Sequence, residues 1–142
     1  MSVTFDFTDR VVIVTGACGA LGSAVADRFA DAGATVCAVD LMAPDSADSL
    51  LSDSAYDTFY QTDLTMEETV EPTIESIVED HGRIDALCNI AGTWRGGSPI
   101  DQTDLESFDL LMNVNLKSAF LTSKHALPHL RETDGAIVSV SA

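Results

Sequence analysis

The chain has 142 residues, of which 46% are hydrophobic, and this is enough for one globular domain with a substantial buried core. Its 23 acidic residues against 7 basic ones give a formal net charge of −16, which argues against partners such as nucleic acid or an anionic membrane surface. The apolar content is also too high for an intrinsically disordered chain.

The acidic residues are spread through the whole sequence, and lysine occurs only at Lys117 and Lys124. We therefore expect a halophilic protein. At 1 M salt the electrostatic screening length falls to about 3 Å, so repulsion among the acidic side chains becomes tolerable. Residues 1–10 lack an apolar stretch of signal-peptide length, and no later run could span a bilayer. The three widely separated cysteines suit small, buried, reduced side chains. These features predict a cytoplasmic protein.

Short apolar runs rich in branched residues indicate strands that are buried on both faces. Four such runs lie at residues 11–15, 35–40, 84–90 and 136–141, and a weaker fifth run lies at residues 58–62. The segments between these runs carry apolar residues at the spacing of a helix. Strands that alternate with helices in this way predict right-handed crossovers and a parallel sheet covered by helices, the doubly wound α/β class.

Apolar residues at four-residue spacing predict an amphipathic helix over residues 21–33, which a glycine ends. Thr65 and Glu68 form a capping-box pattern at the head of a second helix. Pro72 must either kink this second helix or mark its true start. Each helix would pack one apolar face against the predicted sheet.

Thr103 and Glu106 repeat the capping pattern before a long third helix, which we expect to end near Pro128. His125 and His129 lie four residues apart in this segment, a spacing that can grip a metal ion on a helix. Because the proline between them should break the helix and no carboxylate follows in the required pattern, we predict no metal site.

The loop after the first strand run contains Gly16, Gly19 and Gly22 and opens the first helix. Glycines let the backbone turn sharply and approach a pyrophosphate, while the helix N-terminus offers free N–H groups and about half a positive charge. This context predicts a dinucleotide phosphate site in which Leu21 also takes part. The alternative is a tight strand-to-helix turn with no ligand.

Asp40 closes the second strand run, near the spacing of about 20 residues at which an acid binds the adenosine ribose. A carboxylate there accepts both ribose hydroxyls and repels a 2′-phosphate. No arginine or lysine lies in the glycine loop or in residues 41–50 to counter that repulsion. The sequence therefore favours NAD over NADP, unless Asp40 is an ordinary strand-end residue on an acidic surface.

Four further motifs follow in order. Asp63-Leu64-Thr65 comes after the third strand run, Asn89-Ile90-Ala91-Gly92 ends the fourth, Asn113-Val114-Asn115 lies in the long helix, and residues 135–141 form the fifth run. Together with the glycine loop, these motifs resemble the N-terminal part of the short-chain dehydrogenase/reductase family, in its NAD-dependent, FabG-like branch. The resemblance extends over nearly the whole chain. It implies one NAD-binding domain of Rossmann fold over residues 1–142, which stops after the fifth strand.

The resemblance also assigns residues to roles. It places Asp63 at the adenine amino group, and it makes Asn115 a member of the family's catalytic tetrad. Beyond the glycine loop and Asp40, the cofactor-binding residues that it implies are Asp63, Leu64, Asn89, Ala91 and Gly92. The asparagine motif that ends the fourth strand would stabilise the sheet beside the cofactor.

Three departures from the family pattern stand out. Ala20 occupies the place of a usual glycine, which gives a glycine spacing closer to that of epimerase-like relatives. Counting along the fifth strand puts the usual catalytic serine on Ala142, so that either Ser141 takes the role or the serine lies beyond the end. The Tyr-x-x-x-Lys element is missing, because Tyr56 and Tyr60 are followed by no lysine at the right distance.

The resemblance implies an oxidoreductase that interconverts a small-molecule alcohol and a carbonyl by hydride transfer with NAD. The family's tyrosine supplies the general acid and base, and its lysine lowers the tyrosine pKa. Lacking both, the 142-residue chain is predicted to be inactive alone. The alternatives are a non-catalytic dinucleotide-binding module and an epimerase-like relative. The long helix resembles the family's subunit-interface helix, which implies a homo-oligomer for a complete protein.

Overall fold

Five parallel strands form one sheet in the order β3-β2-β1-β4-β5. The computed structural model describes residues 3–141. Every residue of β1 is buried, as expected for a run of branched side chains that is covered on both faces. The strands are β1 (Val11–Thr15), β2 (Thr35–Asp40), β3 (Thr58–Gln61), β4 (Ala86–Asn89) and β5 (Ala136–Ser139). The predicted doubly wound α/β fold is confirmed.

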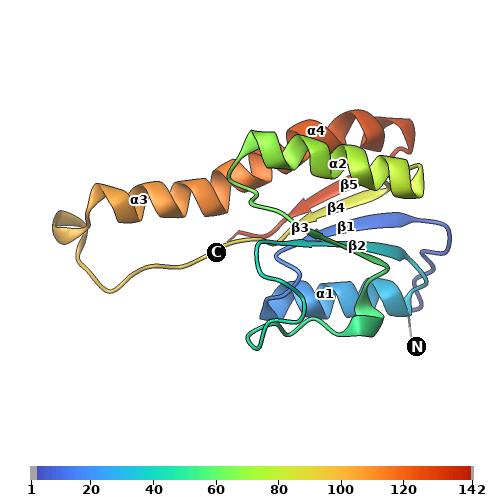
Figure 1. The fold of residues 1–142 in the computed structure, drawn as a ribbon, viewed down its shortest axis with the longest axis horizontal. Helices are drawn as coiled ribbons and strands as arrows, with labels where there is room; N and C mark the ends of the chain where they lie inside the picture. The colour runs from blue at the N-terminus through green and yellow to red at the C-terminus, as the bar shows by residue number, and fades with distance from the viewer. Residues whose placement is uncertain (1–2, 142) are drawn as a thin grey trace.

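Helices cover the two faces of the sheet in separate layers (Figure 1). Helix α1 (Ala20–Asp31) lies on one face, and α2 (Glu67–His81) and α4 (Ser118–Glu132) lie on the other. The alternation of strand and helix is interrupted once, since β2 passes to β3 through a 3-10 turn, η1 (Asp53–Ala55), instead of an α-helix. Side chains of the sheet fill both interfaces with apolar contacts.

The core divides into two hydrophobic clusters, one on each face of the sheet. Ile13 packs with the cluster under α2 and α4, whereas its neighbours Val12 and Val14 pack with the cluster under α1. This division follows from the two-residue period of a strand, which sends successive side chains to opposite faces. The central strand β1 therefore joins both layers.

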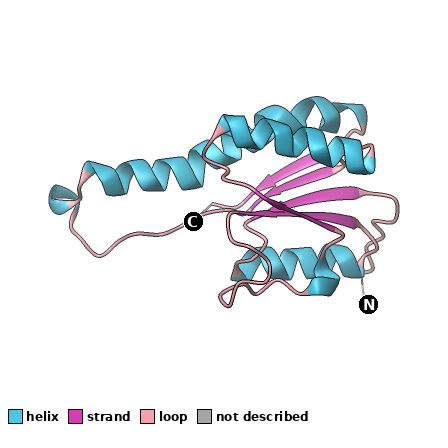
Figure 2. Cartoon of the chain, in the orientation of Figure 1, coloured by secondary structure: helices cyan, strands magenta, loops and turns pink. Residues whose placement is uncertain are grey.

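The chain reverses its direction of travel across the sheet at β1. Strand β1 pairs with β2 on one side and with β4 on the other. Figure 2 shows the loops that leave these strands gathered at the end of the sheet from which a helical arm projects. In doubly wound sheets this switch point, outside the carboxyl ends of the strands, is where ligands bind.

Three strands are shorter than predicted, and the first of them, β3, ends at Gln61 instead of residue 62. Strand β4 covers Ala86–Asn89 instead of residues 84–90, and just before it the Asp85 side chain, through Oδ2, accepts the backbone N–H of Val11 at 2.9 Å. Strand β5 ends at Ser139 and not at residue 141, since its partner β4 ends at Asn89, which pairs with Ser139. The ladder therefore stops where the neighbouring strand turns away.

The predicted capping box at the head of α2 is wrong. The helix begins at Glu67, and Thr65 donates its hydroxyl to Asp63 Oδ1 at 2.7 Å, so it caps no helix. Pro72 lies inside α2 and does not mark its start. Thr65 forms its hydrogen bond within the loop that precedes the helix, because a short polar side chain readily closes a turn with its own neighbours.

The cap of the third helix is shifted by one residue. Helix α3 (Leu105–Met112) follows a 3-10 turn, η2 (Ile100–Gln102), and Asp104 is its N-cap, accepting the backbone N–H of Ser107 at 2.7 Å. Thr103, the predicted cap, instead donates to the carbonyl of Pro99. Aspartate and threonine are both good caps, so adjacent candidates are hard to separate from sequence.

The long helix does not end at Pro128. From α3 it passes through a π-helical turn, η3 (Asn113–Lys117), into α4, which continues to Glu132. The flanking residues Ala126 and Leu130 are fully buried in the core, so packing outweighs the one backbone hydrogen bond that the proline removes. No helix within residues 3–141 is both long enough and apolar enough to cross a membrane.

Candidate functional site

A cleft of about 640 Å³ opens at the carboxyl ends of β1, β2 and β4. Its walls come from the glycine loop, the end of β2, the loops after β3 and β4, and the π-helical turn. The predicted cofactor-binding residues that line it are Gly16, Gly19, Leu21, Gly22, Asp40, Asp63, Leu64, Ala91 and Gly92. Loops distant in sequence thus meet where the topology places a ligand.

The glycine loop packs so tightly that two of its glycines admit no side chain. Gly16 adopts a φ of +65°, and a Cβ there would lie 2.7 Å from Ala91 Cα. A Cβ at Gly22 would overlap the carbonyl of Gly16. Both glycines let α1 and the loop after β4 close on the turn.

Gly19 plays a different part, because a Cβ there would make only an ordinary contact, 3.5 Å from Gly16 O. Gly19 is the N-cap of α1, and within the described residues it supplies no side-chain cap while the first turn carries no acid. The N–H groups and the positive end of the helix dipole therefore face the cleft. This cradle fits the pyrophosphate of a dinucleotide.

Asp40 stands at the edge of the cleft with its carboxylate held by two backbone N–H groups. Its Oδ2 accepts from Cys18 N and its Oδ1 accepts from Met42 N, both at 2.9 Å. Each carboxylate oxygen has a second lone pair and can also accept a ribose hydroxyl. Among the cleft-lining residues of the described chain there is no lysine or arginine to neutralise a 2′-phosphate.

Asp63 and Leu64 form the wall that follows β3. Asp63 Oδ1 accepts from the backbone N–H and the hydroxyl of Thr65, at 2.9 and 2.7 Å, which fixes the carboxylate at the cleft. Leu64 is buried and belongs to the core cluster under α2. The wall therefore combines one oriented acceptor with an apolar surface, a combination suited to an adenine ring.

Thr15 joins the two strands at the switch point and was not predicted to have a role. Its buried hydroxyl accepts the backbone N–H groups of Ile90 and Ala91, at 3.0 and 3.1 Å, and donates to the carbonyl of Cys88. These bonds hold the loop after β4 against the glycine loop. Its position as a hydroxyl residue closing the strand before the glycine loop was the available signal.

Asn89, predicted among the cofactor-binding residues, does not line the cleft, and its contact with a cofactor stays a prediction. Its Oδ1 accepts from Thr122 Oγ1 at 2.6 Å, and its Nδ2 donates to the hydroxyls of Ser123 and Ser139. The buried amide thus fastens β4 to α4 and β5. It supports the site from behind, because burial forces it to satisfy its polar atoms within the protein.

Asn115 lies in the π-helical turn and holds the loop after β4 by its backbone. Its Oδ1 accepts from Thr93 N at 2.8 Å, and its Nδ2 donates to Thr93 O at 2.9 Å. A Cβ on Gly92 would lie 2.9 Å from Asn115 Oδ1, so a side chain there would displace the Asn115 amide. Single π-turns inside α-helices often mark functional positions.

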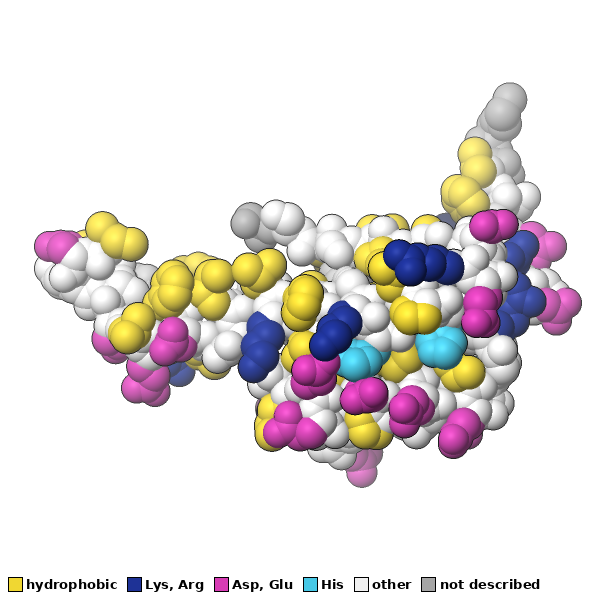
Figure 3. Space-filling view, turned by 90° about the horizontal axis from the view of Figure 1, so that it is seen from above, with side chains coloured by type: hydrophobic (Ala, Val, Ile, Leu, Met, Phe, Trp, Pro, Cys, Tyr) yellow, Lys and Arg dark blue, Asp and Glu magenta, His cyan; other side chains and the backbone are white. Residues whose placement is uncertain are grey.

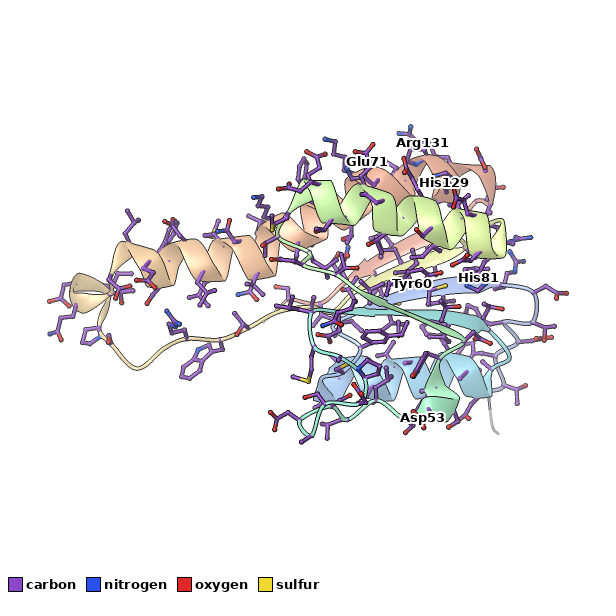
Figure 4. The ribbon with its side chains drawn as sticks, viewed as in Figure 1. Asp53, Tyr60, Glu71, His81, His129 and Arg131 are labelled. Atoms are coloured by element: carbon purple, nitrogen blue, oxygen red, sulfur yellow. The ribbon has the colours of Figure 1, made fainter. Side chains whose placement is uncertain are left out.

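Ser141, the predicted catalytic serine, is exposed beyond the end of β5, and Ala142, where the family count places the serine, lies outside the described residues. Neither tyrosine lines the cleft. Figure 4 shows Tyr60 between the sheet and α2, where its hydroxyl donates to Asp80 at 2.6 Å. Burial, with this hydrogen bond, raises the pKa of Tyr60, which further disfavours proton transfer. Tyr56 packs against Phe59.

His125 serves as a bridge between helices. Its Nε2 lies 2.8 Å from Glu67 Oε1, and the same carboxylate oxygen also accepts from Lys124, so α4 is tied to the start of α2. The hydrogen bonds from Lys124 and His125 lower the pKa of Glu67. Residues 3–141 contain no group of three or more side chains placed to hold a metal ion.

Comparisons with known proteins agree with this geometry. A family model described as short chain dehydrogenase matches residues 10–142. An L-fucose dehydrogenase of Oryctolagus cuniculus is 32% identical over 137 residues, covering 95% of this chain and 47% of that protein. An aldohexose dehydrogenase of Thermoplasma acidophilum, solved in ligand-free form, matches with a TM-score of 0.85 and 31% identity, over 96% of this chain and 50% of that one.

A third match is a 3-ketoacyl-(acyl-carrier-protein) reductase of Brucella melitensis complexed with NADH, with a TM-score of 0.86 and 26% identity. It covers 96% of this chain and 59% of that one. The chain spans about half the length of the curated relatives it matches. Since the family model matches nearly all of its residues, the chain belongs to the short-chain dehydrogenase family.

Proposed function

We propose that residues 1–142 form one NAD-binding domain of an oxidoreductase that interconverts a small-molecule alcohol and a carbonyl. The observation that carries this proposal is a single cleft that joins an open helix N-terminus, at Gly19, to a carboxylate, Asp40. The first suits a pyrophosphate and the second suits ribose hydroxyls. The bound nicotinamide would accept or supply the hydride.

Several residues of the chain would hold the dinucleotide. The N–H groups at the start of α1 would bind the pyrophosphate, Asp40 the adenosine ribose, and Asp63 the adenine amino group. Ala91 and Gly92 would lie close to the cofactor. Hydrogen bonds from Ala91 N to Thr15 and from Thr93 N to Asn115 hold the backbone there in place. Bound NADH in the Brucella melitensis reductase supports this assignment.

The preference for NAD over NADP follows from charge. Asp40 would face a 2′-phosphate with no cation lining the described cleft. Titration of the chain with NADH and NADPH, followed by ligand fluorescence, should show NADH binding at least about tenfold more tightly, and Asp40→Ala should narrow the difference. Equal or tighter binding of NADPH by the wild-type chain would refute the assignment.

Asn115 and Ser141 are the two residues of the chain to which the proposal gives a part in catalysis. Asn115 would act as a positioning residue through Thr93, and Ser141 is the serine nearest the expected place. Because the sequence has no Tyr-x-x-x-Lys, we expect the 142-residue chain to show no turnover with a panel of alcohols and sugars at high salt, since general acid and base catalysis contributes about 10²- to 10⁴-fold. Turnover would place a proton donor within these residues.

A second candidate is a dinucleotide-binding module without catalysis. A chain that binds NADH and never oxidises an alcohol would fit it.

The glycine spacing around Ala20 is the single observation in favour of an epimerase-like relative. We also propose a halophilic protein on the strength of the net charge of −16, so that raising the salt concentration should raise its stability. The three free, buried cysteines support a location in a reducing cytoplasm.

A homo-oligomer is the last part of the proposal. Exposed apolar side chains follow one another along the projecting helix, as Figure 3 shows. This stripe consists of Leu105, Phe108, Met112, Leu116 and Phe120. Contiguous apolar surface of this kind usually marks an interaction site, and a second copy of the chain would cover it.

A further inference from the structure

The segment between β2 and η1, residues 41–52, forms one side of the cleft without regular structure. Leu41 and Met42 line the cleft directly. In Figure 1 the segment loops past the N-terminal end of α1. Its far end is anchored, because Leu51 is buried in the cluster under α1. Its near end, beside Asp40, is held by Gln61 Nε2, which donates to the Leu41 carbonyl at 2.9 Å, but it lacks a buried anchor, since Leu41 and Met42 are exposed.

Cys18 of the glycine loop supplies that anchor. Its thiol donates to the carbonyl of Met42 at 3.5 Å, and its own carbonyl accepts the backbone N–H of Leu50 at 2.9 Å. Its backbone N–H meets Asp40 Oδ2 at 2.9 Å. One residue therefore touches both ends of residues 42–50 and the carboxylate that precedes them.

The thiol is suited to this contact because it stays protonated. Cys18 is buried, and burial, together with the nearby charge of Asp40, raises the pKa of its thiol against a smaller opposing effect of Ser49. A neutral thiol is a donor, whereas a thiolate would repel both the Met42 carbonyl and the Asp40 carboxylate. Side chain and backbone of Cys18 thus act in the same direction.

We propose that Cys18 is a positioning residue, which latches residues 42–50 onto the glycine loop and thereby fixes Asp40 for the adenosine ribose. Asp40 Oδ1 is held by Met42 N, whose carbonyl is the acceptor of the Cys18 thiol. Releasing Met42 therefore loosens one of the two bonds that orient the carboxylate. The inference rests on the proposed function, in that it takes Asp40 to be the ribose ligand.

The latch makes cofactor selectivity depend on a residue without charge. An oriented carboxylate both accepts the ribose hydroxyls and repels a 2′-phosphate, whereas a freely rotating one does each less well. Loss of the latch should consequently weaken NADH binding more than NADPH binding. A mere packing defect in the loop would weaken both dinucleotides alike.

The test compares Cys18→Ala with Cys88→Ala in the 142-residue chain. Both cysteines are buried in the same hydrophobic cluster, so each variant loses one sulfur from the same core, but the thiol hydrogen bond to Met42 comes from Cys18. We expect Cys18→Ala to weaken NADH binding about three- to tenfold, the range of one lost hydrogen bond, and to narrow the preference over NADPH. Cys88→Ala should leave both dissociation constants unchanged.

Cys18→Ser provides the rescue, since its hydroxyl can still donate toward Met42, and it should restore most of the selectivity. Amide hydrogen exchange without cofactor gives an independent readout. The Met42 and Leu50 amides should exchange faster in Cys18→Ala than in the wild type or Cys88→Ala. Unchanged exchange, or equal weakening of NADH and NADPH, would overturn the latch while leaving NAD binding intact. A wild-type chain that binds no NADH, yet shows the faster exchange in Cys18→Ala, would keep the latch and refute the proposed function and the positioning role together.

Discussion

Two parts of the sheet, the strands β1 and β2 near its centre and the edge strand β5, differ sharply in how much of their surface is buried. Around β1 and β2 the strands are buried, the glycine loop is packed to backbone contact, and Asp40 is held by two hydrogen bonds. At the edge all four residues of β5 are exposed, and the helical arm carries uncovered apolar side chains. The region around the cleft is therefore covered by its own residues, whereas β5 and the helical arm leave apolar surface exposed.

A substitution at Gly22 should have the largest effect on the well-packed region around the glycine loop. In Gly22→Ala the added Cβ overlaps the Gly16 carbonyl, so the turn cannot close, and we expect a loss of about 3 kcal/mol in the free energy of unfolding with loss of NADH binding. Urea denaturation measures the first effect and titration the second. Gly19→Ala is the matched control for stability, because its Cβ meets only an ordinary contact. Equal stability of the two variants would contradict the packing described for the loop.

The junction of β1 and β4 is tested at Asp85, whose nearly buried carboxylate accepts from Val11 N, Arg83 and Arg10. In Asp85→Ala the Val11 amide loses its partner, and we expect a cost of about 1.5–3 kcal/mol, the range for hydrogen bonds to a charged group. Both arginines are half exposed, so solvent screens their share. Glu79→Ala, at an exposed acid, should change stability by less than about 0.5 kcal/mol.

Asp85 also predicts a pH dependence. Burial acts to raise its pKa, but the hydrogen bonds from Arg83, Val11 and Arg10 together lower it below the ordinary value. A carboxyl whose pKa is lower in the folded chain stabilises the fold above its unfolded pKa, and that stabilisation is lost as the pH falls through the folded value. The wild type should therefore lose stability below about pH 4 more steeply than Asp85→Ala. Parallel acid denaturation curves would contradict this.

The sequence predicted the turn after β1 and the end of β2 better than the ends of the later strands and helices. The glycine loop and Asp40 are local patterns, in which a few consecutive residues dictate a turn or a strand end. The hydrogen bonds of Thr15 and Asn89 reach partners 75 and 33 residues away, so their places in the sequence indicate a role but not the partners. The same holds for Cys18, which looked like a small buried side chain.

Helix ends were predicted less well, for a related reason. Thr65 and Thr103 both match a capping pattern, but each hydroxyl is taken up by the preceding loop. Pro128 should end a helix in isolation, yet tertiary burial of Leu130 carries α4 past it. In each of these places competition from residues outside the local window decides the outcome.

The exposed stripe of the helical arm gives the smallest expected effect on stability. In Phe108→Asp and Phe120→Asp an apolar side chain that is already more than half exposed is replaced, so the free energy of unfolding should change by less than about 0.5 kcal/mol. The association state should change instead, because a charge within an apolar interface between copies would have to be desolvated. Sedimentation velocity at high salt should show wild-type oligomers and largely monomeric variants. Ile100→Asp, at a residue 93% exposed outside the stripe, should leave association unaltered. A wild-type chain that sediments as a monomer would show that the stripe is not a self-association surface of these residues.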